Sequence, residues 1–257
     1  MKVTVATALL AAVALYAAQP PSPKSAPAQQ LPPGVKIVTN APVRSNRANP
    51  AAAAPTTVPT TSADLTLLQC GNLIYAGNKS SVCFADKFLG DVARDTNLRV
   101  AKNFRPVKLD SDGLFDFPFC VLSGEGPFTL TPRERENLRR YLLNGGFILS
   151  SPGCSDSAWD KSMRTELKLV MPDHSLKQLP MTHPVFSIVH PVTRLVCKNG
   201  STTLVDAMEV NGRLAMIYSK DGLNDVANAK GCCCCGGNQI NDSARVNVNI
   251  FTYALLY

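Results

Sequence analysis

The sequence predicts one α/β domain built on a parallel sheet, over residues 62–257, behind an N-terminal stretch of different character. Two continuous apolar runs, residues 117–122 and 147–150, have the pattern of strands that are buried on both faces. A segment with helical periodicity follows each run. Strand, helix, strand, helix is the order of βαβ units, in which right-handed crossovers join parallel strands.

An amphipathic helix is expected before the first of these strands, over residues 82–96. The strand at 117–122 then ends in Ser-Gly-Glu-Gly, which predicts a tight loop. The helical spacing that predicts the first helix is carried by its apolar residues Phe84, Phe88, Leu89 and Val92.

The second helix has the clearest boundaries in the chain. Thr131 is placed to be its N-cap, Pro132 fits the first helical position, and Glu134 completes a capping box. Asn144 and the two glycines that follow it are expected to end the helix, because glycine adopts the left-handed C-terminal turn without strain.

Three further elements complete the predicted domain. Asn211-Gly212 is the strongest short signal for a β-hairpin, because both residues accept a positive φ. The elements are a helix over about 157–171, a hairpin of strands 204–210 and 213–219, and a C-terminal helix over 242–257.

The first 61 residues predict export. Lys2 precedes the apolar run 3–18, which is typical of a signal peptide and shorter than the ~20 residues of a comfortable membrane span. The cleavage site is poor, so residues 1–18 are a signal peptide or an uncleaved N-terminal anchor. Residues 19–61 are rich in Pro, Ala and Thr and predict a disordered linker. We expect an extracytoplasmic protein, periplasmic or secreted, that contacts a membrane only through an uncleaved N-terminal segment.

The charge pattern does not predict nucleic-acid binding. Lys and Arg number 26 against 19 Asp and Glu, a net charge of +7, but the cations are scattered. Their densest group, residues 133–140, is interleaved with glutamates and is expected to be the solvated face of a helix.

Nine cysteines are an odd number, so at least one thiol stays free or pairs between chains. Four of them are consecutive: Cys232, Cys233, Cys234 and Cys235. Metal sites space their cysteines so that the thiolates converge on one ion, whereas adjacent side chains diverge. A vicinal disulfide or pairing with the dispersed cysteines is therefore favoured, and a metal site or a redox role remains the alternative.

A family resemblance rests on the order of several motifs from residue 114 onward. Leu-Phe-Asp-Phe-Pro-Phe (114–119) leads to Leu-Ser-Gly-Glu-Gly-Pro-Phe (122–128), and LRRYLLNGGF (138–147) and HPVF (183–186) follow. Val-Asn-Gly-Arg-Leu-Ala (210–215) and Asn-Ile-Phe-Thr-Tyr-Ala-Leu (249–255) come near the end. Together they resemble the bacterial DUF4159 family, over most of residues 65–257.

The resemblance implies a three-layer, flavodoxin-like fold related to class I glutamine amidotransferases and to ThuA-like proteins. It implies no activity, because one fold supports many functions. The chain also departs from the family pattern. Glu125 stands where a histidine is expected, Ser151-Pro152 where acidic residues are common, and Thr182 where aspartate usually precedes His-Pro. Each departure removes a polar group from the region where an α/β sheet builds its site.

Glu125, Cys154 and His183 are the candidate catalytic residues. Cys154 lies between a strand and a helix, roughly where an amidotransferase-like fold places its nucleophile. A reactive thiolate would need a base such as His183 within hydrogen-bond reach. The residues around Cys154 lack the usual small-x-Cys-x-small pattern, so a structural or disulfide-bonded cysteine is favoured.

The leading functional hypothesis is an exported, non-enzymatic domain that binds a small polar ligand or a protein partner. The alternative is a hydrolase or transferase of a small polar substrate, for which the resemblance to ThuA-like proteins suggests a carbohydrate link. A metal or redox role of the four-cysteine run is a second alternative. No cofactor is predicted, because Gly124-Glu125-Gly126 is too short for a nucleotide-binding fingerprint.

Overall fold

A computed structural model describes residues 67–80, 87–223 and 238–257 of the chain. All of them belong to one compact unit, Thr57–Tyr257. The predicted signal or anchor and the whole of the predicted linker lie outside the described residues. Among the helices described here, none combines the length and the apolar character needed to cross a membrane.

The fold is organised around a seven-stranded, mostly parallel sheet with the strand order β2-β1-β3-β4-β9-β8-β5. The first five strands are parallel, and β8 and β5 add an antiparallel edge. The strands are β2 (Arg105–Lys108), β1 (Gly71–Ile74), β3 (Phe119–Gly124), β4 (Phe147–Pro152), β9 (Arg213–Tyr218), β8 (Asp206–Val210) and β5 (Lys177–Gln178). A separate hairpin pairs β6 (Leu195–Val196) with β7 (Thr202–Thr203).

The parallel part of this sheet has the flavodoxin-like order, in which the chain runs outward in both directions from β1 and β3. The loops after β1 and β3 therefore diverge to opposite sides, and a topological switch point lies between them. Ligands of open α/β sheets bind outside the carboxyl ends of the strands at such a point. The predicted α/β, mostly parallel fold is confirmed.

Local sequence signals mark the start of helix α2 and the turn of the β8–β9 hairpin. The capping box of α2 is present: Thr131 Oγ1 accepts from Glu134 N at 3.2 Å, and Glu134 Oε2 accepts from Thr131 N at 2.7 Å. Asn211 and Gly212 both have a positive φ and make the predicted hairpin turn between β8 and β9. The helices are α1 (Phe88–Asp95), α2 (Pro132–Leu143), α3 (Ser157–Val170) and α4 (Ser243–Leu256), with short 3-10 turns at Asp112–Asp116, Gly153–Ser155 and Pro184–Phe186.

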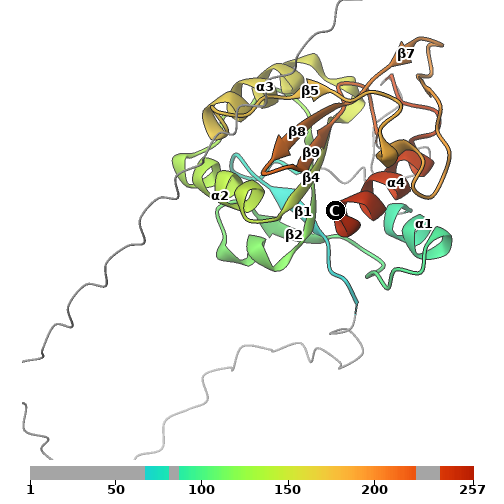
Figure 1. Ribbon diagram of the computed structural model, residues 1–257. Helices are drawn as coiled ribbons and strands as arrows, with labels where there is room; N and C mark the ends of the chain where they lie inside the picture. Colours follow the sequence, from blue (N-terminus) through green and yellow to red (C-terminus); the bar gives the residue numbers. More distant parts are fainter. Residues whose placement is uncertain (1–66, 81–86, 224–237) are drawn as a thin grey trace, which may run out of the picture. The chain divides into compact units, whose positions relative to one another are not determined.

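The domain has three layers, with α2 and α3 on one face of the sheet and α1 and α4 on the other (Figure 1). Alternate residues of β3 and β4 face opposite ways, so the two faces carry separate hydrophobic cores. Phe119 and Phe147 stack at 5.5 Å in the core under α1 and α4, while Trp159 lies fully buried in the core under α2 and α3.

Two predicted boundaries were wrong by a few residues. The strand expected at 117–122 is β3, Phe119–Gly124, because Phe117 still caps the 3-10 turn before it and Pro118 has no N–H to pair. The helix expected over 82–96 begins at Phe88 within the described residues, and residues 81–86 lie outside them.

Candidate functional site

The loops after β1 and β3 flank the switch point, and one side-chain bond joins them there. Lys79 Nζ donates to the carbonyl oxygen of Glu125 at 2.9 Å. The backbone of Ala76 donates to Glu134 Oε1 at 2.7 Å, so the carboxylate of the α2 capping box also holds the loop after β1. These charged side chains fix the two loops in place.

Asp156 occupies the N-terminus of α3 at the same edge of the sheet. Its carboxylate accepts from Ala158 N at 2.8 Å, from Trp159 N at 2.9 Å and from Gly126 N at 3.2 Å. The bond from Trp159 N, followed by those from Gly126 and Ala158, lowers the pKa of Asp156. The free N–H groups that could bind an anion at this helix end are therefore filled by the protein's own carboxylate.

The structure brings two of the candidate catalytic residues, Glu125 and Cys154, to adjacent loops. A Cβ atom added to Gly153 would lie 2.9 Å from Glu125 Cγ, so the Glu125 side chain packs directly over the residue before Cys154. Cys154 and Ser155 have φ values of 50° and 53°, two consecutive left-handed residues that are not glycine. This conformation is sparsely populated by such residues and makes the turn from β4 into α3 sharp.

The third candidate, His183, lies elsewhere. Its Nδ1 accepts from Val185 N at 3.2 Å, and its ring packs edge-on against Tyr253 at 5.2 Å. Tyr253 is near the end of α4, whereas Ser155 bonds to Asn238, which precedes the start of that helix. Tyr253 lies ten helical steps after Ser243 in α4, about 15 Å along the axis. Burial lowers the pKa of His183.

The other cysteines of the described region are inert core residues. Cys70, Cys120 and Cys197 are fully buried and form no disulfide. Burial raises the pKa of both Cys70 and Cys120 to about 12, so thiolate is scarce at neutral pH. The run Cys232, Cys233, Cys234 and Cys235 lies outside the described residues. Disulfide pairing, with a metal site or a redox role as the alternative, therefore stays a prediction. Elsewhere in the described ranges, no group of three or more His, Cys, Asp or Glu side chains is arranged to hold a metal ion.

A groove of about 610 Å³ opens at the carboxyl end of β9, beside the β6–β7 hairpin. Asp206 and Gln178, which pair across β8 and β5, form part of its wall, and Lys220 follows the end of β9. The full lining is Arg164, Gln178, Met181, Arg194, Leu195, Thr202, Thr203, Leu204, Asp206 and Lys220. The groove thus lies along the same edge of the sheet as the switch point, displaced toward β8.

One wall of the groove is a fixed ion-pair network. Arg164 on α3 donates from Nη2 to Asp206 at 3.0 Å and from Nε to Asp160 at 2.9 Å. Its guanidinium carbon lies 4.9 Å from the ring centroid of Tyr218, whose hydroxyl donates to Asp160. Burial, followed by the bond to Asp160, raises the pKa of Tyr218. Arg164, Asp160 and Asp206 are therefore paired with one another within the protein.

Two other cations of the groove have no such partner. Arg194 and Lys220 are exposed, and neither makes an ion pair or a side-chain hydrogen bond within the described ranges. Sequence reasoning missed this pair, because 26 residues separate the two cations and only the fold brings both to one groove. The local feature of the sequence closest to this site is the polar stretch 198–203, which lies between the two cations along the chain.

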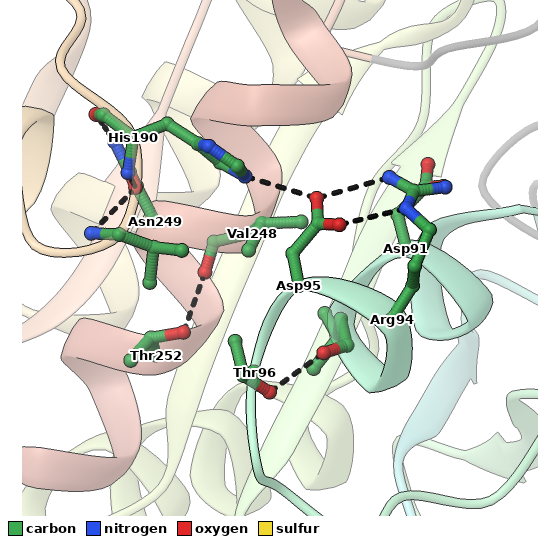
Figure 2. A network of polar contacts seen from close by, with 10 residues as sticks. Asp91, Arg94, Asp95, Thr96, His190, Val248, Asn249 and Thr252 are labelled. Atoms are coloured by element: carbon green, nitrogen blue, oxygen red, sulfur yellow. Dashed lines mark hydrogen bonds and ion pairs between the residues drawn. The ribbon is translucent and has the colours of Figure 1, made fainter.

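A second polar network anchors the loop that carries Arg194 (Figure 2). Asn249 on α4 is fully buried; its Oδ1 accepts from Val189 N at 3.1 Å and His190 N at 2.8 Å, and its Nδ2 donates to the His190 carbonyl at 2.7 Å. His190 Nε2 lies 2.9 Å from Asp95 Oδ2 at the end of α1, as Figure 2 shows. The loop before β6 is thereby joined to both helices of that face.

Comparison with known proteins agrees with the motif order of the sequence. No curated protein matches the chain. One family model does match, and its match begins in the loop after β1 and ends within α4. It spans the Glu125 and Cys154 loops, the groove and the Asn249 network. The model is described as a domain of unknown function, DUF4159, and since it covers residues 79–255, the chain belongs to this family.

Proposed function

We propose that this chain is an exported, non-enzymatic binding domain that takes a small polar ligand in the groove beside the β6–β7 hairpin. The observation that carries the proposal is the groove itself. Its volume of about 610 Å³ suits a small molecule, since ligand pockets commonly span about 300–1,000 Å³. It combines apolar side chains with hydroxyl, amide and charged groups, the mixture that orients a polar ligand.

The contacts at the switch point favour binding over catalysis. Asp156, Lys79 and Glu134 each hold backbone groups, and these bonds position loops. A cysteine nucleophile needs a base within hydrogen-bond reach, and His183 packs against Tyr253 on another part of the domain. This arrangement supports a rigid scaffold in which the candidate catalytic residues have structural roles.

A ligand screen by thermal denaturation tests the proposal. The purified chain is heated with a panel of amino acids, neutral sugars, sugar acids and phosphate compounds, each at millimolar concentration. A ligand that binds the folded state raises the Tm in a concentration-dependent manner. We expect at least one member of the panel to do so, and a substitution of Thr202 by Tyr, which fills the groove, should abolish the shift. A panel without any hit contradicts the proposal.

Export is part of the proposal and rests on the N-terminal sequence. Fractionation of a tagged chain expressed in a bacterial host, with sequencing of its N-terminus, tests it. We expect a product outside the cytoplasm from which residues 1–18 have been cleaved. Recovery from the cytosol with Met1 retained would contradict export, whereas a membrane-bound product with Met1 retained would replace cleavage by anchoring.

A hydrolase or transferase is the second candidate, and the backbone at Cys154 favours it. Residues in sparsely populated conformations cluster at active sites, and Cys154 and Ser155 are two of them in succession, next to the Glu125 side chain. Substrate profiling of the wild-type chain against Cys154→Ala and Glu125→Gln tests this candidate. Turnover that is lost in Cys154→Ala would establish catalysis, and equal activity in all three chains would remove it.

A further inference from the structure

The groove beside the β6–β7 hairpin has an excess of hydrogen-bond donors. Arg194 and Lys220 line it, and both side chains donate without being able to accept. Gln178 and Thr202 add polar groups of mixed character. A ligand that satisfies such a lining must be rich in acceptors.

Among the described residues, the carboxylates in and beside the groove bind other groups, and none forms an ion pair with these two cations. Asp206 Oδ2 accepts from Arg164 at 3.0 Å, which pairs the two other charges of the lining. Asp160, the second carboxylate that Arg164 binds, accepts from the Tyr218 hydroxyl and does not line the groove. Asp221, directly after Lys220, is almost fully buried, and Thr203 at 2.6 Å and Asn238 at 3.0 Å each bond one of its oxygens. Both oxygens of Asp221 are therefore bonded within the protein, one to Thr203 in β7 and one to Asn238 before α4.

The two cations reach the groove from separate parts of the chain. Arg194 precedes β6 and Lys220 follows β9, so they reach the groove from two separate elements. Met181, Leu195 and Leu204 supply an apolar surface between the polar groups. An anionic group can bind the cations while the carbon skeleton of the ligand packs on these side chains.

We infer that the ligand of this groove is a small polar anion, which carries a carboxylate or a phosphate group that Arg194 and Lys220 bind. The inference rests on the proposed binding function and specifies its ligand class. Guanidinium and ammonium groups form charge-assisted bonds with both anions, and these are stronger than bonds between neutral groups. The same chemistry predicts that added salt weakens binding, because exposed charges are screened over about 10 Å at 0.1 M ionic strength.

Calorimetric titration of the full chain with matched probes tests the inference. Glucuronate and glucose differ in one carboxylate, and glucose 6-phosphate and inorganic phosphate form the second arm. We expect glucuronate or glucose 6-phosphate to bind at least about tenfold more tightly than glucose, because a hydrogen bond to a charged group is stronger than one between neutral groups. The preferred probe identifies the anion.

Two substitutions locate the site. Arg194→Gln and Lys220→Gln should each weaken binding of the preferred anion about tenfold and leave the Tm of the free chain nearly unchanged, because both side chains are exposed. The matched controls are Arg105→Gln and Lys108→Gln, which remove the same charges from β2 at the opposite edge of the sheet. These controls should bind like the wild type.

The outcomes separate the inference from the function on which it rests. Binding of glucose as tight as that of glucuronate, unaffected by either groove substitution, overturns the anion assignment and leaves a binding domain. Anion binding that falls equally in the β2 controls shows a general charge effect and also overturns the assignment. A chain that binds none of the four probes overturns the inference, and the wider panel described above then decides the proposed function.

Discussion

Asn249 offers the sharpest test of how the domain holds its groove-forming loop. Replacing it by alanine removes three bonds, from Val189 N, from His190 N and to the His190 carbonyl, all between 2.7 and 3.1 Å. A net hydrogen bond contributes about 1 kcal/mol, and an unsatisfied buried group costs more. Because Val189 and His190 are only partly buried, water can replace some of the lost hydrogen bonds. We expect a loss of about 2–3 kcal/mol in the free energy of unfolding.

Asn247, two residues earlier in the same helix, is the matched control. It is nearly as buried as Asn249, but among the described residues its side chain makes one bond, from Nδ2 to the Leu223 carbonyl, and its Oδ1 has no partner there. Asn247→Ala should cost about 1 kcal/mol. Urea denaturation, with the midpoint and the slope measured for both variants, gives the comparison. A cost for Asn249→Ala that does not exceed that for Asn247→Ala would refute the reasoning.

The same variant links stability to binding. His190 lies four residues before Arg194, so a loop released from Asn249 should hold that cation less firmly. Asn249→Ala should therefore weaken binding of the preferred ligand, while Asn247→Ala should not. Calorimetric titration of both variants below their melting temperatures measures the difference.

Three further predictions address the core, the acid stability and the strand ends. Cys70 and Cys120, with pKa values near 12 and no exposure, should resist iodoacetamide at pH 8 until the protein unfolds; mass spectrometry that finds either labelled in the native state would contradict this. Asp156 has a lowered pKa when folded, so its contribution to stability is complete above its unfolded pKa, about 3.9, and is lost as the pH falls through the folded value. The urea midpoint should drop below pH 4, and less steeply in Asp156→Asn; identical curves would oppose the assignment. Gly124→Ala would place a Cβ 2.3 Å from a buried tyrosine hydroxyl and should cost about 2–3 kcal/mol. Gly90→Ala, with open space in the exposed interior of α1, should instead stabilise by about 0.5–1 kcal/mol, and thermal melts of both variants provide the check.

Local signals predicted the elements that end in strong caps or turns. The Thr131 capping box, the glycines after Asn144 and the Asn211-Gly212 turn each act within a few residues, so the sequence alone was sufficient. The strand β1 was missed because its four residues, Gly71–Ile74, are too few for a pattern. In β2 only Val107 is buried, and Pro106 is typical of an edge strand rather than of a central one.

The groove could not be predicted in the same way. Arg164, Arg194 and Lys220 come from a helix, a loop and a strand end, and only the tertiary fold brings all three to one groove. The Glu125 and Cys154 loops were predictable as neighbours, because the carboxyl ends of adjacent parallel strands share an edge. The place of His183 depended on how the segment after α3 packs onto α4, which no local pattern encodes.

The double role of Glu134 restricts which side chain that position can accept. In an ordinary capping box glutamine replaces glutamate readily, since one oxygen is enough for the N-cap N–H. Here both oxygens are occupied, one by Thr131 N and one by Ala76 N. An amide has a single oxygen, and its NH₂ group would face a second N–H donor. Glu134→Gln would either keep the cap of α2 and release the loop after β1, or keep that loop bound and lose the cap of α2. A carboxylate is therefore required wherever a related chain preserves both bonds, and a glutamine at this position would mark a relative whose first loop follows a different path.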